Sequence, residues 1–312
     1  GDEGEGTDEP DDAEEAAGLD CRAVEVIVPY APGGGSDQQV RRLQSALEDA
    51  LDTRLNIVYQ SGGDGAIGWQ AVSEAEPDGC TIANVVAPNI ILLTETGEDV
   101  GFAADDFEYI AWTEYSPNII GVANDSPFET IEDFIEEARE RPGEVTVSGV
   151  GVPGRLLVSE VLNATDIDLG FVPVSGGVGD IVPQVVGGHI DAAISGFSLL
   201  DGGQIRPLAL SGPERSEAYE DVPTFEEAGY DGVNLVTSWG LILPPETPED
   251  IVETWNATVQ EAMENDEVRE AYAETGFITL SQTAEEAREY LEDQQEAVGT
   301  TMEGLDPAEL EE

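Results

Sequence analysis

The clearest pattern near the start of the chain is a run of alternating branched residues followed by a glycine turn. Residues 24–28, VEVIV, have the composition and alternation of a β-strand, and Pro29 ends it. A helix is predicted after the glycines at 33–35, because apolar residues then recur three or four positions apart, at Val40, Leu43, Leu47 and Leu51. Open α/β sheets are built from such strand–turn–helix units and bind ligands at the turns.

Related units follow in the first half of the chain. Residues 55–59 are predicted as a second strand, which runs into a glycine turn at 60–68 and a helix from 69 to 76. A third strand is expected at 81–87, with a helical turn at 89–93 after it. Two more strands are predicted at 107–112 and 119–122.

The same pattern then starts again. The elements predicted for this second run are helix 130–138, strand 145–148, a turn at 149–155 with a helix to 162, strand 169–174, a turn at 175–180, helix 181–186 and strand 190–194. The remaining elements are strand 206–211, a capped helix at 222–229, strand 235–243 and acidic helices at 249–265, 266–274 and 284–302. Two separate runs predict an α/β fold with two lobes, whose glycine turns face each other across a cleft.

The charge of the chain is extreme. It has 68 acidic residues against 11 basic ones, all of them arginine, for a net charge of −57. Such a surface repels nucleic acids and anionic membranes, so neither is an expected partner. Regular periods after residue 21 argue against disorder, so we expect a folded protein in molar salt, where charge repulsion is screened within a few ångströms. This composition resembles that of haloarchaeal proteins. Residues 1–21 are predicted to form a disordered acidic tether.

The two cysteines, Cys21 and Cys80, precede the strands predicted at 24–28 and 81–87. In a doubly wound sheet of order 2-1-3 these strands are parallel neighbours, so both cysteines lie at one sheet edge within bridging distance. A disulfide would indicate an oxidising, extracytoplasmic compartment, and the alternative is two free buried thiols. The sequence has no recognisable transmembrane run or signal peptide.

Enzyme chemistry finds little support in the sequence. Gly63, Gly65 and Gly68 match G-x-G-x-x-G, but the next strand ends without the acidic residue that a dinucleotide site needs. The single histidine, His189, has no partner cluster, and no EF-hand or Cys/His metal spacing is present. We predict no catalytic residue, no metal and no cofactor, and keep a dinucleotide-dependent α/β enzyme as the alternative.

Several motifs, taken in order, resemble those of the Bug-type solute receptors of tripartite tricarboxylate transporters. They lie at 28–30, 33–37, 60–68, 77–81, 106–107, 188–191, 221–229, 239–240 and 244–248, and the likeness spans about residues 24–300. The resemblance implies a Venus flytrap fold of the type II periplasmic-binding-protein class with a crossing hinge. One lobe would hold residues 22–122 and 237–312, and the other residues 123–236.

The resemblance also implies a ligand and a site. The ligand would be a small carboxylate or dicarboxylate held mainly by main-chain N–H groups, and helix N-termini that begin at residues such as Ser36 and Asp37 suit an anion. The ligand-binding residues expected from the first lobe are Tyr30, Gly34, Gly35, Ser36, Asp37, Gly65, Ala66, Pro88 and Asn89. Those expected from the second lobe are Ser148, Gly149, Arg155, Ser175, Gly176, Gly177 and Ser195.

The second lobe departs from the family pattern at several of these positions. The family often has a serine-rich stretch where this chain has residues 152–155, a lysine at Val174 or Ser175, and an acid where it has Ser195. Arg155 could bind a carboxylate in bidentate fashion, or it could form an ordinary surface ion pair with one of the many acids. The sequence leaves both roles open.

The function that the resemblance implies is that of an extracytoplasmic receptor. It would capture a carboxylate between its lobes and deliver it to the membrane permease subunits of a tripartite tricarboxylate transporter. A receptor for a signalling partner is a further alternative, because one fold serves both roles. We expect an exported monomer, and the sequence leaves open a lipid anchor at the outer face of the cell membrane.

Overall fold

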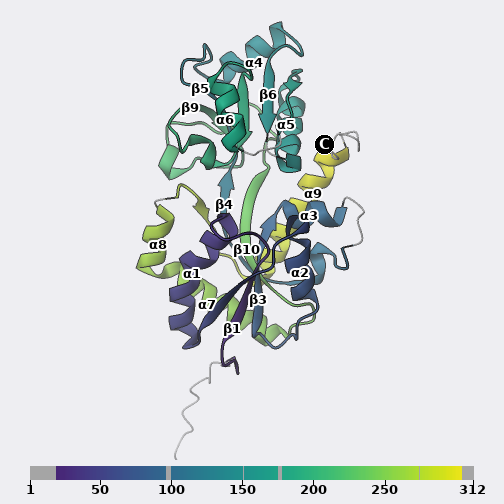
Figure 1. The fold of residues 1–312 in the computed structure, drawn as a ribbon, viewed down its shortest axis with the longest axis vertical. Coiled ribbons are helices and arrows are strands. Elements are labelled where there is room, and N and C mark those ends of the chain that lie inside the picture. The colour runs from purple at the N-terminus through teal and green to yellow at the C-terminus, as the bar shows by residue number, and fades with distance from the viewer. Residues whose placement is uncertain (1–18, 96–99, 150, 175–177, 274, 304–312) are drawn as a thin grey trace, which may run out of the picture.

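The computed structural model describes residues 19–95, 100–149, 151–174, 178–273 and 275–303, and it has two lobes (Figure 1). Each lobe is built on one β-sheet with helices packed against it. The acidic tether predicted at 1–21 lies outside the described residues up to position 18. Within the described ranges, no helix is both long and apolar enough to cross a membrane.

The first lobe contains a mixed sheet of six strands in the order β11-β4-β10-β3-β1-β2. Its strands are β1 (Val24–Val28), β2 (Leu55–Tyr59), β3 (Thr81–Ala87), β4 (Glu108–Pro117), β10 (Val236–Leu243) and β11 (Ile278–Thr279). β1 is parallel to β2 and β3, whereas β10 is antiparallel to β3 and β4. The helices of this lobe are α1 (Gly35–Leu51), α2 (Ala66–Ser73), α3 (Asn89–Glu95), α7 (Glu249–Glu264), α8 (Asp266–Ala273) and α9 (Ala284–Glu303).

The second lobe contains a sheet of five shorter strands in the order β7-β6-β8-β5-β9. They are β5 (Ile119–Ala123), β6 (Thr146–Gly149), β7 (Gly170–Phe171), β8 (Ala192–Ser195) and β9 (Ile205–Leu210), accompanied by α4 (Ile131–Glu140), α5 (Gly151–Thr165) and α6 (Val178–Val186). Short 3₁₀ turns lie at η1 (Gly63–Gly65), η2 (Ala104–Asp106), η3 (Phe197–Leu200) and η4 (Glu217–Tyr219).

Amphipathic periodicity explains how the first unit packs. α1 buries the apolar stripe that includes Val40, Leu43 and Leu47, and these side chains form one cluster with the buried residues of β1. Burying an aliphatic side chain of this size stabilises the fold by about 1.5–3 kcal/mol relative to leaving it exposed. Arg41, Ser45 and Asp49 lie exposed on the opposite side of the helix, so the stripe fixes which way the helix faces.

The strand order confirms the predicted neighbours at the N-terminal edge of the first sheet. β1 lies between β2 and β3, with Glu25 opposite Thr81. Cys21 and Cys80 form a disulfide with their Cα atoms 5.6 Å apart, a bond that the predicted 2-1-3 order permits, so the alternative of two free thiols is wrong.

Three expectations about elements are wrong. Residues 119–122 belong to β5 in the second sheet, so they are not part of the first lobe, and the first crossing lies between Pro117 and Ile119. β7 ends at Phe171 instead of 174. The helix expected at 222–229 is a turn, because backbone groups at 223 and 225 hydrogen-bond to Leu210 at the end of β9. Thr224 and Glu227 still exchange the predicted capping hydrogen bonds there.

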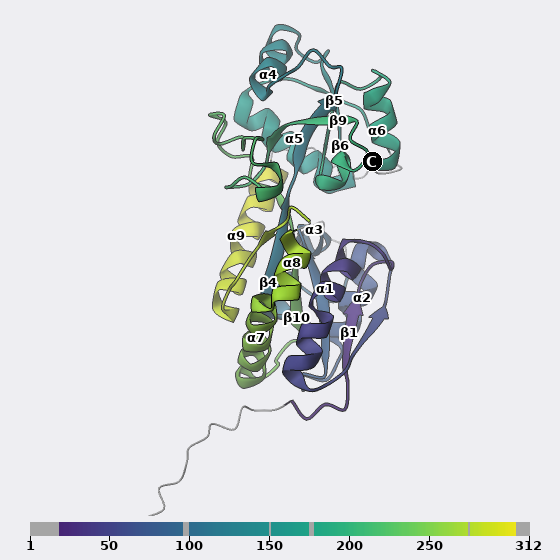
Figure 2. The same cartoon turned by 90° about the vertical axis from the view of Figure 1, so that its left-hand side faces the viewer.

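The lobes are connected by more than the two crossing strands. α9 runs along β4 and reaches the second lobe, where it contacts α5 (Figure 2). Near its start, the indole of Trp112 on β4 donates to the carbonyl of Ala287 (3.0 Å). Near its end, Thr301 hydrogen-bonds to Glu160 of α5. The C-terminal helix therefore follows the hinge from one lobe to the other.

Candidate functional site

The registers of the two sheets bring the predicted ligand turns face to face. Val236 of β10 pairs with Pro117 of β4, and Ser238 pairs with Ala87, so the carboxyl ends of β3 and its parallel neighbour β1 point toward the crossing. In the second lobe, Ser195 at the carboxyl end of β8 pairs with Ile119, which directly follows that crossing. The sheet edges that carry the predicted ligand turns therefore face each other between the lobes.

The first turn, at 33–37, is held by a buried carboxylate. Asp37 accepts hydrogen bonds from the backbone N–H of Gly33 (2.7 Å), from Nε of Arg41 (2.8 Å) and from the hydroxyl of Tyr59 (2.7 Å). Burial acts to raise the pKa of Asp37, but the hydrogen bonds from Tyr59, Gly33 and Arg41 hold it below its usual value. The carboxylate is charged and fully engaged, so Asp37 positions the turn.

This geometry corrects the predicted helix start. α1 begins at Gly35 with Gly34 as an extended N-cap that carries no side-chain hydrogen bond, so neither Ser36 nor Asp37 caps it. Ser36 is buried in the first turn, whereas Gly34 is exposed. The first-turn N–H groups of a helix have no acceptor within the helix, and here they lie at the interlobe edge. This is the place at which the glycine pattern predicts an anion-binding element.

The second and third turns of the first lobe lie beside the first. The hydroxyl of Tyr30 donates to the carbonyl of Asp64 (2.9 Å), and its ring meets Trp69 edge-on at 6.1 Å between centroids. Burial raises the pKa of this tyrosine, and the charge of Asp64 adds to the effect. Gly65 and Ala66 stand where η1 passes into α2. Pro88, after a cis peptide bond, and Asn89 stand at the start of α3.

The second lobe presents the end of β6 and the first turn of α5. A Cβ on Gly149 would lie 2.9 Å from the backbone of Gly154, and one on Gly154 would lie 2.5 Å from the backbone of Gly149. Only glycine at both positions permits this approach of strand end to helix. Ser148, at 0% exposure, is buried beside it, and its hydroxyl has no hydrogen-bond partner among the described residues.

Arg155 follows in the same helix. Its guanidinium lies over the ring of Phe171 at the end of β7, 4.4 Å from the centroid. It makes no hydrogen bond or ion pair within the described part of the chain, so the surface ion pair left open by the sequence is not formed there. Ser195 ends β8 half-buried. The predicted residues Ser175, Gly176 and Gly177 lie outside the described residues.

Sequence reasoning missed one residue of the first lobe that contacts these turns. The indole of Trp239 on β10 lies against Gly35, where a Cβ would be 2.9 Å from its Cζ2 atom. Alternation along the strand expected at 235–243 shows that Trp239 shares a face with Thr237, but not that this face meets α1. That contact depends on the central place of β10 in the sheet.

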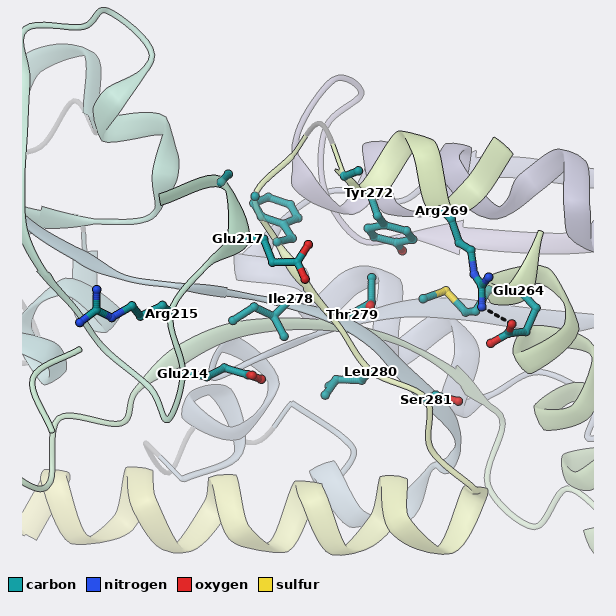
Figure 3. Close-up of a pocket in the computed structure, with 15 residues that line it drawn as sticks. Glu214, Arg215, Glu217, Glu264, Arg269, Tyr272, Ile278, Thr279, Leu280 and Ser281 are labelled. Atoms are coloured by element: carbon teal, nitrogen blue, oxygen red, sulfur yellow. Dashed lines mark hydrogen bonds and ion pairs between the residues drawn. The ribbon is translucent and has the colours of Figure 1, made fainter. Parts of the chain in front are cut away.

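A separate cavity lies beside the hinge, on the side of α8 and η4 (Figure 3). It measures about 420 Å³, and Glu214 and Glu217 line it from the second lobe. The two arginines of the lining, Arg215 and Arg269, are paired with Glu227 and Glu264, so their charges are already neutralised. This acidic lining disfavours an anionic ligand, so the facing glycine turns remain the better candidate site. Within the described residues no group of acids, cysteines or histidines could hold a metal ion.

Comparison with known proteins agrees with this arrangement. The model of the tripartite tricarboxylate transporter family receptors matches residues 39–306. The chain belongs to this family. The protein BugT of Bordetella pertussis is 25% identical over 283 residues, which cover 88% of this chain and 86% of BugT. A protein encoded in the tcbD–tcbE intergenic region of Pseudomonas sp. strain P51 is 27% identical over 265 residues, 83% of this chain and 79% of that protein.

Solved structures of relatives have the same fold. A solute-binding protein of this family from Polaromonas, without ligand, aligns with a TM-score of 0.79 at 25% identity and covers 91% of this chain and 99% of the other. The R. palustris protein Rpa4515 with adipate aligns with a TM-score of 0.74 at 26% identity, covering 90% and 97%. The receptor therefore has the two-lobed type II periplasmic-binding fold, and it is an extracytoplasmic solute-binding protein.

Proposed function

We propose that this receptor binds a small dicarboxylate between its lobes and delivers it to the membrane subunits of a tripartite tricarboxylate transporter. The observation that carries the proposal is the set of unused donors at the two facing sheet edges. The first lobe contributes the N-terminal N–H groups of α1. The second contributes the buried hydroxyl of Ser148 and the guanidinium of Arg155, both without a polar partner among the described residues.

Arg155 is the residue that best suits a charged ligand group. Six of the 11 arginines pair with acids, as expected in a chain with 68 of them. Arg155 instead stacks on Phe171, which fixes its plane and leaves its N–H edge free. A guanidinium held in this way binds a carboxylate through two parallel hydrogen bonds. A second carboxylate would suit the α1 turn across the cleft.

The relatives support this ligand class. The structure of Rpa4515, 26% identical to this receptor, contains adipate, a dicarboxylate with a four-methylene chain. We infer the same class for this receptor and use adipate as the first probe. The lobes would close around the ligand by hinge motion at the crossings, with the described residues of 22–118 and 236–303 in one lobe and those of 119–235 in the other. We further propose that the receptor is an exported monomer that acts together with the permease and catalyses no reaction.

The proposal is tested by thermal unfolding in 2 M KCl with a panel of ligands. Acetate, L-malate, adipate, citrate, L-aspartate and NAD would each be added at millimolar concentration. A ligand that binds only the folded state at 100 times its Kd stabilises the protein by about 2.7 kcal/mol, so a binding dicarboxylate raises Tm by several degrees. A shift with NAD and none with any carboxylate would overturn the proposal in favour of a dinucleotide site.

Arg155→Ala is the variant that tests the residue assigned to the ligand. Its affinity for adipate, measured by calorimetry, should fall at least tenfold, because a charge-assisted bidentate contact is lost. Arg141→Ala is the matched control, since Arg141 is exposed and paired with Glu137 and Glu144. It should bind adipate as the wild type does. If all three proteins bound adipate with equal affinity, Arg155 would not be a ligand-binding residue.

A further inference from the structure

Among the tryptophans, one differs from the others in its hydrogen bonding. Three of the four are fully buried and donate the indole N–H to a backbone carbonyl: Trp69 to Asn84 (2.9 Å), Trp112 to Ala287 (3.0 Å) and Trp255 to Gly79 (3.0 Å). Trp239 is half-buried, and its N–H has no acceptor in the part of the chain that the structure describes. An indole N–H usually finds a partner when it leaves water.

The free N–H of Trp239 lies beside the first turn of α1. A Cβ built on Gly35 would be 2.9 Å from Cζ2, 3.2 Å from Cε2 and 3.3 Å from Nε1 of the indole. The edge of the ring that carries the N–H therefore lies against the first residue of the helix. The unpaired N–H groups of that helical turn and the indole N–H stand together at the interlobe edge.

The ring of Trp239 is held in place by further aromatic side chains. Phe277 stacks on it with centroids 5.4 Å apart and planes at 13°. Phe277 in turn lies 6.3 Å from Phe197, and Phe197 lies 4.9 Å from Tyr219, both from the second lobe. These near-parallel rings run from the first lobe to the second. The orientation of the indole is thus fixed before any ligand arrives, which lowers the entropy lost on binding.

We propose that Trp239 is a ligand-binding residue of the cleft, whose indole N–H donates to a ligand carboxylate at the N-terminus of α1 while its ring contacts the ligand's carbon chain. The inference rests on the proposed function, since it assigns a further donor to the same site. It also implies a preference: an aliphatic dicarboxylate can use both the N–H and the ring, whereas a short, highly polar ligand can use only the N–H.

The variant that removes the N–H is Trp239→Phe. Phenylalanine keeps a six-membered ring that can stack on Phe277, and it loses the donor together with part of the indole's area, a loss that the control below shares. The affinity for adipate, measured by isothermal titration calorimetry in 2 M KCl, should fall about tenfold, as expected for one charge-assisted hydrogen bond. The Tm of the unliganded variant should stay within about 2 °C of wild type, because the lost N–H has no protein partner.

Trp255→Phe is the matched control. It makes the same chemical change at an indole N–H that donates to Gly79, away from the interlobe edge. It should lower Tm and leave the affinity for adipate unchanged. In ¹⁵N–¹H spectra of the wild type, the indole signal of Trp239, assigned by its loss in the variant, should shift most among the tryptophans when adipate is added.

The outcomes separate this inference from the proposed function. Wild type and Trp239→Phe binding adipate with equal affinity, with an unmoved indole signal, would overturn the inference and leave the carboxylate receptor intact. Failure of the wild type to bind adipate or L-malate at all would overturn both. A tenfold loss in Trp239→Phe together with unchanged affinity in Trp255→Phe supports the assignment.

Discussion

The two sheet edges that face each other treat their polar groups in opposite ways. Below the turns of the first lobe, several buried polar side chains have at least one polar partner: Gln39 bonds to Thr113 (2.9 Å) and to Asn84 (3.0 Å), Arg42 pairs with Glu114, and Asp37 has three donors. At the edge of the second lobe, Ser148 and Arg155 have no polar partner within the described ranges. The first lobe uses its polar groups to fix a rigid turn, and the second leaves donors for a ligand.

The buried ion pair of the first lobe gives the largest expected effect. The side chains of Arg42 and Glu114 are 10% and 0% exposed, and Arg42 also lies over the ring of Tyr272. Arg42→Ala leaves a buried carboxylate alone and should lower the free energy of unfolding by about 3–5 kcal/mol. Urea denaturation in 2 M KCl measures it.

The neighbouring arginine is the matched control for this change. Arg41 pairs with Asp37 from the surface, with 55% of its side chain exposed, so Arg41→Ala should cost at most about 1 kcal/mol. If the two variants lost equal stability, the buried pair would have no special role in the first lobe.

Glu160 of α5 is the buried carboxylate of the second lobe, and it faces the hinge instead of the cleft. It is 6% exposed and accepts hydrogen bonds from the backbone N–H groups of Asn234 (3.0 Å) and Leu235 (2.8 Å). Burial raises the pKa of Glu160 to about 7, because its effect is larger than that of the hydrogen bonds, which lower the pKa. The folded state therefore keeps a proton that the unfolded state, with an ordinary pKa of 4.5, has lost.

The sign of the resulting pH dependence follows from that difference. Between pH 4.5 and 7 the folded state binds more protons, so the contribution of Glu160 to stability falls as pH rises and is constant above pH 7. Glu160→Gln should remove this slope, worth roughly 1–3 kcal/mol. Unfolding free energies of both proteins at pH 5 and pH 8 in the same salt test this, and parallel pH curves would contradict it.

Asp37 tests whether the rigid turn matters for binding. Asp37→Ala removes the acceptor for Gly33, Arg41 and Tyr59 and should cost about 1–2 kcal/mol of stability. It should also weaken adipate binding about tenfold, since the α1 donors lose their fixed geometry. Tyr59→Phe, which removes one of the three bonds, is the graded control. If calorimetry showed full affinity in Asp37→Ala, the hydrogen bonds that Asp37 accepts would not be needed for ligand binding.

Ser148 gives the smallest stability effect and the sharpest contrast with the first lobe. Because its buried hydroxyl has no described partner, Ser148→Ala should change the free energy of unfolding by no more than about 0.5 kcal/mol. Its affinity for adipate should fall about threefold to fivefold if the hydroxyl donates to the ligand. A large loss of stability with normal affinity would reverse the comparison between the two edges.

In the first lobe, the local sequence pattern predicted several elements correctly. The strands expected at 24–28, 55–59 and 81–87 have these bounds in the structure, because alternating branched residues between turn residues leave few other conformations. The predicted order of these strands placed Cys21 and Cys80 within bridging distance, and the structure contains the disulfide. The glycine turns and the helices after them were likewise found, since apolar spacing and glycine act within a few residues.

The sequence by itself determined the local units of this receptor, its two-run α/β organisation and its extreme charge. Only the tertiary structure decided that residues 119–122 join the second sheet. It also decided that Asp37, at the first turn, accepts a hydrogen bond from Tyr59 of β2. The same holds for Trp239, which meets Gly35 only because β10 returns to the centre of the first sheet. Periodicity records which face of an element is buried, whereas pairing between distant segments depends on hydrogen bonds and packing that no local pattern encodes.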